Sequence, residues 1–113
     1  MAQNFRNYLQ RNIGDITAVD LLGGAVGAGT FDCIISVRLA NTTNSTINVD
    51  TYIKDSSTDY YLIKNVPIVS GGSLELIDGG SRIVLQGGQQ LYAISDTATS
   101  LDTVVSIVDE IST

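Results

Sequence analysis

The feature that most constrains the fold is an alternation of apolar and polar residues between Thr30 and Asp55. Two segments, TFDCIISVRLA and INVDTYIKD, carry it, and the polar turn NTTNST joins them. Because successive side chains of a strand point to opposite faces, a period of two gathers apolar residues on one side only in an extended chain. The sequence therefore predicts a β-hairpin. Its buried face is expected to hold Phe31, Cys33, Ile35, Val37 and Leu39, then Ile47, Val49, Thr51 and Ile53.

The rest of the chain repeats this pattern of short apolar segments separated by turns. Strands are predicted around 16–22, 60–68, 73–77, 82–86, 90–95 and 103–111, with glycine-rich turns at 23–29, 70–72, 78–81 and 87–88. Pro67 cannot donate to a ladder, so its strand is expected to end there or to lie at an edge. About eight short strands predict an all-β fold, an antiparallel β-sandwich with a jelly-roll-like or immunoglobulin-like outline.

The chain is expected to hold a short N-terminal arm, residues 1–12, and a β-sandwich domain, residues 13–113. Phe5, Tyr8 and Leu9 have the i, i+3, i+4 spacing that favours one face of a short helix. Residues 1–12 carry two arginines and no acidic residue, whereas the whole chain has a net charge of −6. The arm is expected either to pack on its own domain or to dock onto a neighbour.

Aromatic and arginine side chains are the preferred anchors of buried interfaces. The predicted partner-docking residues are therefore those of the arm: Phe5, Arg6, Tyr8, Leu9 and Arg11.

The composition argues against catalysis and against several classes of ligand. The chain has no histidine, which removes the commonest general base and the commonest transition-metal ligand. The segment GGAVGAGT at 23–30 lacks the Gly-Lys-Ser/Thr ending of a phosphate-binding loop. The acidic residues lack the spacing of a calcium loop, and DSSTD at 55–59 is better explained as a hairpin tip. We expect no enzyme activity, no cofactor and no bound metal.

Neither nucleic acid nor a membrane is expected as a partner. The six basic residues are scattered singly and form no basic stripe, which argues against binding of nucleic acid. No apolar run approaches the roughly 20 residues that span a bilayer, and the polar N-terminus lacks the apolar stretch of a secretory signal, so no membrane partner is expected.

The single cysteine and the strand tyrosines are expected to serve packing or contacts and not chemistry. Cys33 is the single cysteine and is expected to act as a small buried hydrophobe. The strand tyrosines have two interpretations, because tyrosine joins apolar area to a polar tip. They either straddle core and rim or form a contact surface for another subunit: Tyr52, Tyr60, Tyr61 and Tyr92.

Three consecutive stretches carry a resemblance to a known class of protein. They are LANTTNSTINVDTYI, YYLIKNVPIVSGGSLELIDGGSRIVLQGGQQLYAIS and LDTVVSIVDE, and they cover roughly two-thirds of the chain, residues 38–110. In order and spacing they resemble small virion structural proteins of tailed bacteriophages, especially those of marine and cyanobacterial phages. Relatives commonly approach the first core strand through a Pro-Ala-Gly-type turn, whereas GGAVGAG stands here.

The resemblance implies a compact β-sandwich that is made in the host bacterial cytoplasm and resides in the virion. The implied function is a non-enzymatic capsid decoration or cement protein that docks at capsomer junctions. Its partners would be the major capsid protein or other virion proteins, in a homo-oligomer or a multi-copy array. The alternative is a neck, tail or fibre-associated adaptor of the same particle, with glycan binding as one role. A free carbohydrate-binding module is a third reading, against which stands the absence of tryptophan.

Overall fold

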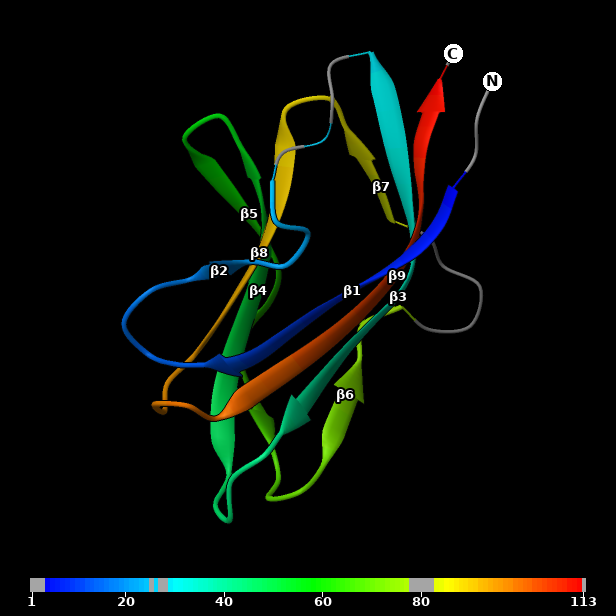
Figure 1. The fold of residues 1–113 in the computed structure, drawn as a ribbon. Helices are drawn as coiled ribbons and strands as arrows, with labels where there is room; N and C mark the ends of the chain where they lie inside the picture. The colour runs from blue at the N-terminus through cyan, green and yellow to red at the C-terminus, as the bar shows by residue number, and fades with distance from the viewer. Residues whose placement is uncertain (1–3, 25, 27–28, 78–82, 113) are drawn as a thin grey trace.

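The computed structural model describes residues 4–24, 26, 29–77 and 83–112, which form two antiparallel β-sheets packed against each other (Figure 1). The first sheet, here called the β1 sheet, contains β1 (Asn4–Ile13), β9 (Leu101–Ser112), β3 (Thr30–Asn41), β6 (Ser73–Glu75) and β7 (Ile83–Gln86). The second, the β4 sheet, contains β2 (Val19–Asp20), β8 (Gln89–Ser95), β4 (Ile47–Asp55) and β5 (Thr58–Ile68). The prediction of an antiparallel β-sandwich is confirmed.

The order of the strands is that of a jelly roll. The β1 sheet runs β1-β9-β3-β6 and the β4 sheet runs β2-β8-β4-β5. Because β6 and β7 both pair with β3, one after the other along it, they fill a single place in the order. With these two taken as one interrupted strand, the described chain has the double Greek-key arrangement of eight strands. Of the two outlines expected from the sequence, the jelly roll is the one found.

The core lies between the two sheets and is built by inward-facing apolar residues of both. Ile47, Val49 and Thr51 of β4 have no exposed surface, as the alternation predicts. From the opposite sheet, Val37 and Val105 are equally buried. The period-two pattern therefore explains the burial of the central strands. In the part of the chain that the structure describes there is no helix, and so none that could cross a membrane.

Residues 4–13 form an edge strand, so the prediction of a short helix there was wrong. β1 pairs with β9 in an unbroken antiparallel register from Asn4 opposite Asp109 to Gln10 opposite Thr103 (Figure 1). Tyr8 packs against the core from this strand. A helix of this length is marginal in isolation, whereas the free edge of β9 offers a complete ladder of hydrogen bonds. The expected arm therefore packs on its own domain.

A β-bulge in β3 shifts the alternation of that strand. Ile34 lies opposite Ile107 and Ser36 lies opposite Ser106, so two steps along β3 match one step along β9. Ile35 is the extra residue, and a bulge of this kind reverses the phase of the side chains that follow it.

The bulge separates the residues predicted to share one buried face. Val37 and Leu39, beyond the bulge, are fully buried as predicted. Before the bulge, Ile34 takes the inward position with no exposed surface. The prediction was wrong for the other three, which are only half-buried: Phe31, Cys33 and Ile35.

The remaining strand predictions agree with β5 to β9, with ends shifted by at most two residues. The strand predicted at 16–22 is reduced to β2, and Ile16 is 91% exposed. Pro67 lies in β5, which is an edge strand as expected. The hairpin tip predicted at 55–59 is confirmed, because Asp55 pairs with Thr58 across a two-residue turn. The turn predicted at 78–81 lies outside the described residues.

Candidate docking surface

Exposed apolar side chains gather on the outer face of the β1 sheet. On β1, Phe5 is 77% exposed and Leu9 is 64% exposed. Phe5 lies opposite Val108 and Leu9 opposite Val104, both on β9, and Val104 is 42% exposed. On the other side of β9, Val108 lies opposite Cys33 of β3. Opposed residues project to the same face of a sheet, so we call these five residues the outer apolar stripe.

The outer apolar stripe has no cover among the described residues, since every described strand belongs to one of the two sheets. Its Leu9 end borders a shallow hollow of about 260 Å³, and Arg11 and Asp102 stand at the rim of that hollow. The backbone N–H of Asn12 donates to the Asp102 carboxylate at 3.0 Å. The surface therefore has an apolar centre with charged groups beside it, which is the usual anatomy of a protein interface.

The five predicted docking residues do not all share this surface. Phe5 and Leu9 belong to the outer apolar stripe, and Arg11 lines the hollow next to Leu9. Arg6 and Tyr8 occupy the alternate positions of β1, opposite the inward-facing Ile107 and Val105. The structure thus divides the predicted set between two faces because β1 is extended rather than helical.

Sequence reasoning missed the part of the outer apolar stripe that β3 and β9 supply. Val104 and Val108 alternate with the buried Val105 and Ile107 in the segment VVSIV. This segment has apolar residues on both faces of the strand. That pattern in the sequence already indicates that the outer face, as well as the inner one, makes contacts. Cys33 was expected in the core, and the bulge in β3 places it on the outer face instead.

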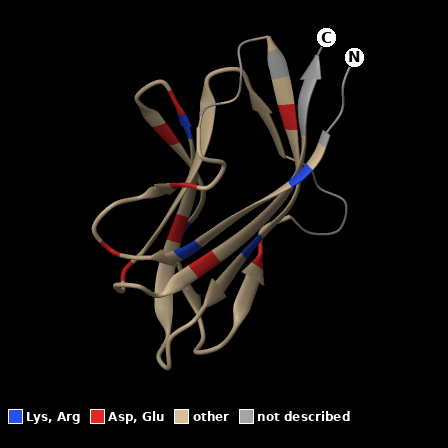
Figure 2. Cartoon of the chain, in the orientation of Figure 1, with Lys and Arg blue, Asp and Glu red and all other residues tan. Residues whose placement is uncertain are grey.

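The strand β1 also differs from the rest of the molecule in charge. It carries Arg6 and Arg11 and no acidic residue, whereas acidic residues are spread over the other strands and loops (Figure 2). An acidic partner surface would therefore meet least repulsion at β1.

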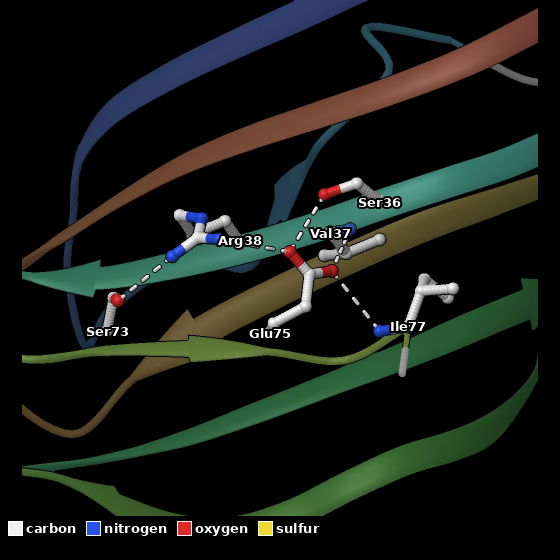
Figure 3. Close-up of polar contacts among 6 residues, drawn as sticks. All are labelled: Ser36, Val37, Arg38, Ser73, Glu75 and Ile77. Atoms are coloured by element: carbon white, nitrogen blue, oxygen red, sulfur yellow. Dashed lines mark hydrogen bonds and ion pairs between the residues drawn. The ribbon is translucent and has the colours of Figure 1, made fainter. Parts of the chain in front are cut away.

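A polar network beside the outer apolar stripe holds the bulged strand β3 in place (Figure 3). The Glu75 carboxylate accepts hydrogen bonds from the Ser36 hydroxyl at 2.8 Å and from the backbone N–H groups of Val37 at 2.9 Å and Ile77 at 3.2 Å. The Arg38 guanidinium lies 3.7 Å from the same carboxylate. Since Arg38 is opposite Val104 on β9, this network abuts the stripe and fixes its geometry.

Three of the four tyrosines considered as a contact surface form a cluster on the outer face of the β4 sheet. The rings of Tyr52 and Tyr92 are stacked with centroids 5.6 Å apart, and Tyr61 lies 5.1 Å from Tyr52 at a tilt of 47°. Burial under these neighbours raises the pKa of the Tyr52 phenol. Tyr60 lies opposite Ile53 on the other face of β5 and is not part of the cluster. The rings pack on one another, so the cluster stabilises the sheet more than it offers a free ring face to a sugar.

Lysines cover the tyrosine cluster. The Lys64 ammonium lies 4.5 Å from the centroid of the Tyr61 ring and 3.4 Å from the Asp50 carboxylate. The negative charge of Asp50 raises the pKa of Lys64. Lys54 lies 5.9 Å from the Tyr92 ring centroid and 3.5 Å from the Asp59 carboxylate. These lysines are engaged within the molecule.

Within the described ranges, no group of three or more histidine, cysteine, aspartate or glutamate side chains is placed to hold a metal ion. The glycine-rich segment at 23–29 is described only in part. The expectation that the chain has no cofactor stays a prediction.

By its fold the chain belongs to the antiparallel β-sandwiches with jelly-roll strand order. No family model, no curated protein and no solved structure matches it. The resemblance to phage virion proteins therefore rests on the sequence stretches alone and stays a prediction.

Proposed function

We propose that this chain is a non-enzymatic structural subunit of a tailed-phage particle, a decoration or cement protein that docks at capsomer junctions. The observation that carries the proposal is the outer apolar stripe. Phe5, Leu9 and Val104 expose 77%, 64% and 42% of their surface on one sheet face, with Leu9 beside Val104 and Asn7 between Leu9 and Phe5. Exposed apolar surface that gathers on one face marks interaction sites, because water disfavours it in a free monomer.

The fold gives the proposal secondary support. Jelly rolls are recurrent in viral capsid domains, although the same fold serves other functions. The shared fold supports the resemblance, and the outer apolar stripe remains the main evidence for docking.

Docking of this kind would act by repetition. The outer apolar stripe lies on a hydrogen-bonded sheet, so little conformational freedom is lost when it is covered. A single stripe gives a modest contact. Many copies on a repeating shell, engaged at once, hold the layer through avidity. Arg11 and Asp102 at the rim would set the orientation of each contact.

The test is incorporation of variants into particles. Val104→Asp introduces a carboxylate into the proposed contact. Arg38 and Arg11 lie beside it, but docking would still remove the water around a charge at an apolar position. We expect it to lower the copy number per particle roughly tenfold or more, because such a charge costs more than the ~1.4 kcal/mol that corresponds to a factor of ten. Gel densitometry of purified particles measures the effect.

Ile16→Asp is the matched control, because Ile16 is 91% exposed and lies in the loop before β2. It should be incorporated like the unmodified chain. Both variants should unfold at the same urea concentration as the parent, which separates docking from folding. Incorporation of Val104→Asp at the parental level would rule out the outer apolar stripe as the docking surface.

The alternative is an adaptor of the neck, tail or fibres, in which glycan binding is one role. Its support is that jelly rolls also occur in lectin domains. The packing of Tyr52 against Tyr61 and Tyr92 weighs against sugar stacking there. The number of copies per particle separates the two roles, since a decoration protein repeats over the whole head and a neck protein occurs in one ring.

A further inference from the structure

We propose that two copies of this chain associate through β1, antiparallel about a twofold axis that passes beside Asn7. The two β1 sheets would then form one continuous sheet, in the order β6-β3-β9-β1 followed by the same strands of the second copy in reverse. The proposal concerns the isolated chain and does not depend on the phage assignment.

The first observation is that β1 offers a long and regular free edge. It is the terminal strand of its sheet, and among the described residues no strand pairs with its outer side (Figure 1). From Asn4 to Gln10 its register with β9 has no bulge. Natural proteins block such edges with prolines, bulges or charges. Over this stretch the sequence has no proline and only one charged residue, Arg6.

The second observation is that the sequence of this edge is complementary to itself in one register. With Asn7 opposite Asn7 of the second copy, Phe5 lies opposite Leu9 of that copy on the outer face. On the inner face Arg6 lies opposite Tyr8 of the second copy. Apolar pairs and an arginine beside an aromatic ring are both favourable cross-strand neighbours.

Neighbouring registers lack this complementarity. A twofold axis at Arg6 would place the two Arg6 side chains opposite each other, and like charges directly opposed are destabilising. An axis at Tyr8 would place Phe5 opposite Arg11 of the second copy. An axis at Leu9 would pair Phe5 with Ile13, beyond the irregularity between Gln10 and Ile13. The register centred on Asn7 avoids all three problems.

The third observation is that this register joins the apolar surfaces of the two copies. Leu9 is opposite Val104 and Phe5 is opposite Val108 within each subunit. Pairing Phe5 with Leu9 of the second copy therefore makes the two outer apolar stripes continuous across the dimer. Both stripes stay on the same side of the sheet, since opposed residues share a face.

Charge favours β1 as the place of contact. Each chain has a net charge of −6, so two copies repel each other over most orientations. Residues 4–13 contain no acidic residue, so the approach through β1 brings the fewest carboxylates together. One pair of strands is a small interface, so the dimer should depend on protein concentration and tighten as salt screens the net charge.

The experiment is disulfide trapping in a Cys33→Ser background, which removes the single natural thiol. Asn7→Cys would place two thiols directly opposite each other. Opposed Cα atoms of antiparallel strands are about 4.5–5.5 Å apart, within the range that a disulfide spans. Gln10→Cys is the control on the same strand, and it removes none of the pairs from which the register is argued. Its two copies would be about six residues out of register, roughly 20 Å apart, and should not cross-link.

We expect Asn7→Cys to form a covalent dimer under mild oxidation at least ten times faster than Gln10→Cys. Sedimentation of the unmodified chain should show a dimer that grows with protein and salt concentration. Equal cross-linking of the two variants would overturn the register. A chain that stays monomeric at all concentrations would overturn the dimer and leave the β1 edge to another partner.

Separate experiments test the dimer and the docking surface, so one proposal can fail while the other holds. Val104 lies one strand away from the β1 edge, so Val104→Asp tests particle docking without touching the strand pair. The dimer is read from the isolated chain, and docking is read from particles. Each result stands without the other.

Discussion

At the scale of single residues, the buried side chain of Asn41 links three segments of the fold by hydrogen bonds. It is 3% exposed at the end of β3. Its amide nitrogen donates to the carbonyl oxygens of Ser45 at 2.8 Å, Ile68 at 2.9 Å and Val69 at 3.2 Å. Its amide oxygen accepts from the backbone N–H and the hydroxyl of Thr43. One side chain thus ties the turn before β4 to the end of β5.

Replacement of this residue should be costly. Asn41→Ala removes the buried hydrogen bond to the Ile68 carbonyl and the contacts to Ser45, Val69 and Thr43, so we expect a loss of about 2 to 3 kcal/mol in the free energy of unfolding. Urea denaturation measures it. Asn44→Ala, in the exposed part of the same turn, should change stability by less than about 0.5 kcal/mol. An equal effect of both variants would show that the contacts of Asn41 contribute little.

Asp96 makes the stability of the fold depend on pH in the acid range. The backbone N–H of Asn48 donates to its carboxylate at 3.0 Å, and this bond lowers the pKa of Asp96 below its ordinary value of 3.8. A carboxyl group with a lowered pKa in the folded state stabilises the fold above its ordinary pKa. That contribution is lost as pH falls through the lowered pKa.

The corresponding variant is Asp96→Asn, which keeps an acceptor but removes the charge. At neutral pH we expect it to be less stable than the parent by no more than about 0.5 kcal/mol, because solvent screens this exposed carboxylate. The difference should shrink as pH falls below 3.8 and vanish only below the lowered pKa of Asp96. Urea denaturation across pH tests this, and a difference that persists in acid would contradict the assigned cause.

At the scale of elements, the bulge in β3 depends on a residue that lies almost forty positions away. Glu75 accepts hydrogen bonds from the N–H groups of Val37 and Ile77. Arg38 contributes an ion pair to Glu75 at 3.7 Å and an exposed hydrogen bond to the Ser73 hydroxyl at 3.3 Å. Charged hydrogen bonds to backbone groups are stronger than exposed ion pairs. The carboxylate should therefore matter through the backbone of the bulge.

We expect Glu75→Ala to lower the free energy of unfolding by about 2 kcal/mol. Arg38→Ala should cost about 0.5 kcal/mol, because an exposed pair is screened by solvent. Thermal unfolding monitored by circular dichroism compares the two. If Arg38→Ala proved the more harmful variant, the ion pair and not the bulge would be the stabilising contact.

Two elements show where sequence reasoning reached its limit. For β4 the alternation identified the buried residues, because each side chain follows the pleat without interruption. For β3 it identified only Val37 and Leu39, because the bulge at Ile35 reverses the phase and no residue type announces a bulge. For β1 the spacing of Phe5, Tyr8 and Leu9 fits a helix, yet the residues also alternate. The free edge of β9 decides between the two.

At the scale of the whole molecule, residues 4–12 of the expected arm are part of the sandwich. They cover one edge of β9, and Tyr8 packs on the core. We expect removal of residues 1–12 to lower the free energy of unfolding by at least about 3 kcal/mol, since it removes a ladder of hydrogen bonds and a partly buried aromatic ring.

Urea denaturation of the truncated chain tests this prediction. An unchanged midpoint would mean that β1 is an appendage, as the division at residues 1–12 and 13–113 assumed. A lower midpoint would also mean that truncation cannot serve as a test of docking, because it would change the fold as well as the surface. Point variants such as Val104→Asp are the better probe for that reason.

The sequence by itself determined that the chain is all-β, where most strands lie and which residues of β4 face the core, because alternation is a local property of the pleat. Only the tertiary structure decided the jelly-roll order, the inward turn of Ile34, the outward position of Cys33 and the conversion of the N-terminal segment into an edge strand. These depend on which strands meet across the sheet, and pairing between distant segments leaves no mark on either segment alone. The docking surface is of this second kind, since β1, β9 and β3 each supply part of one stripe.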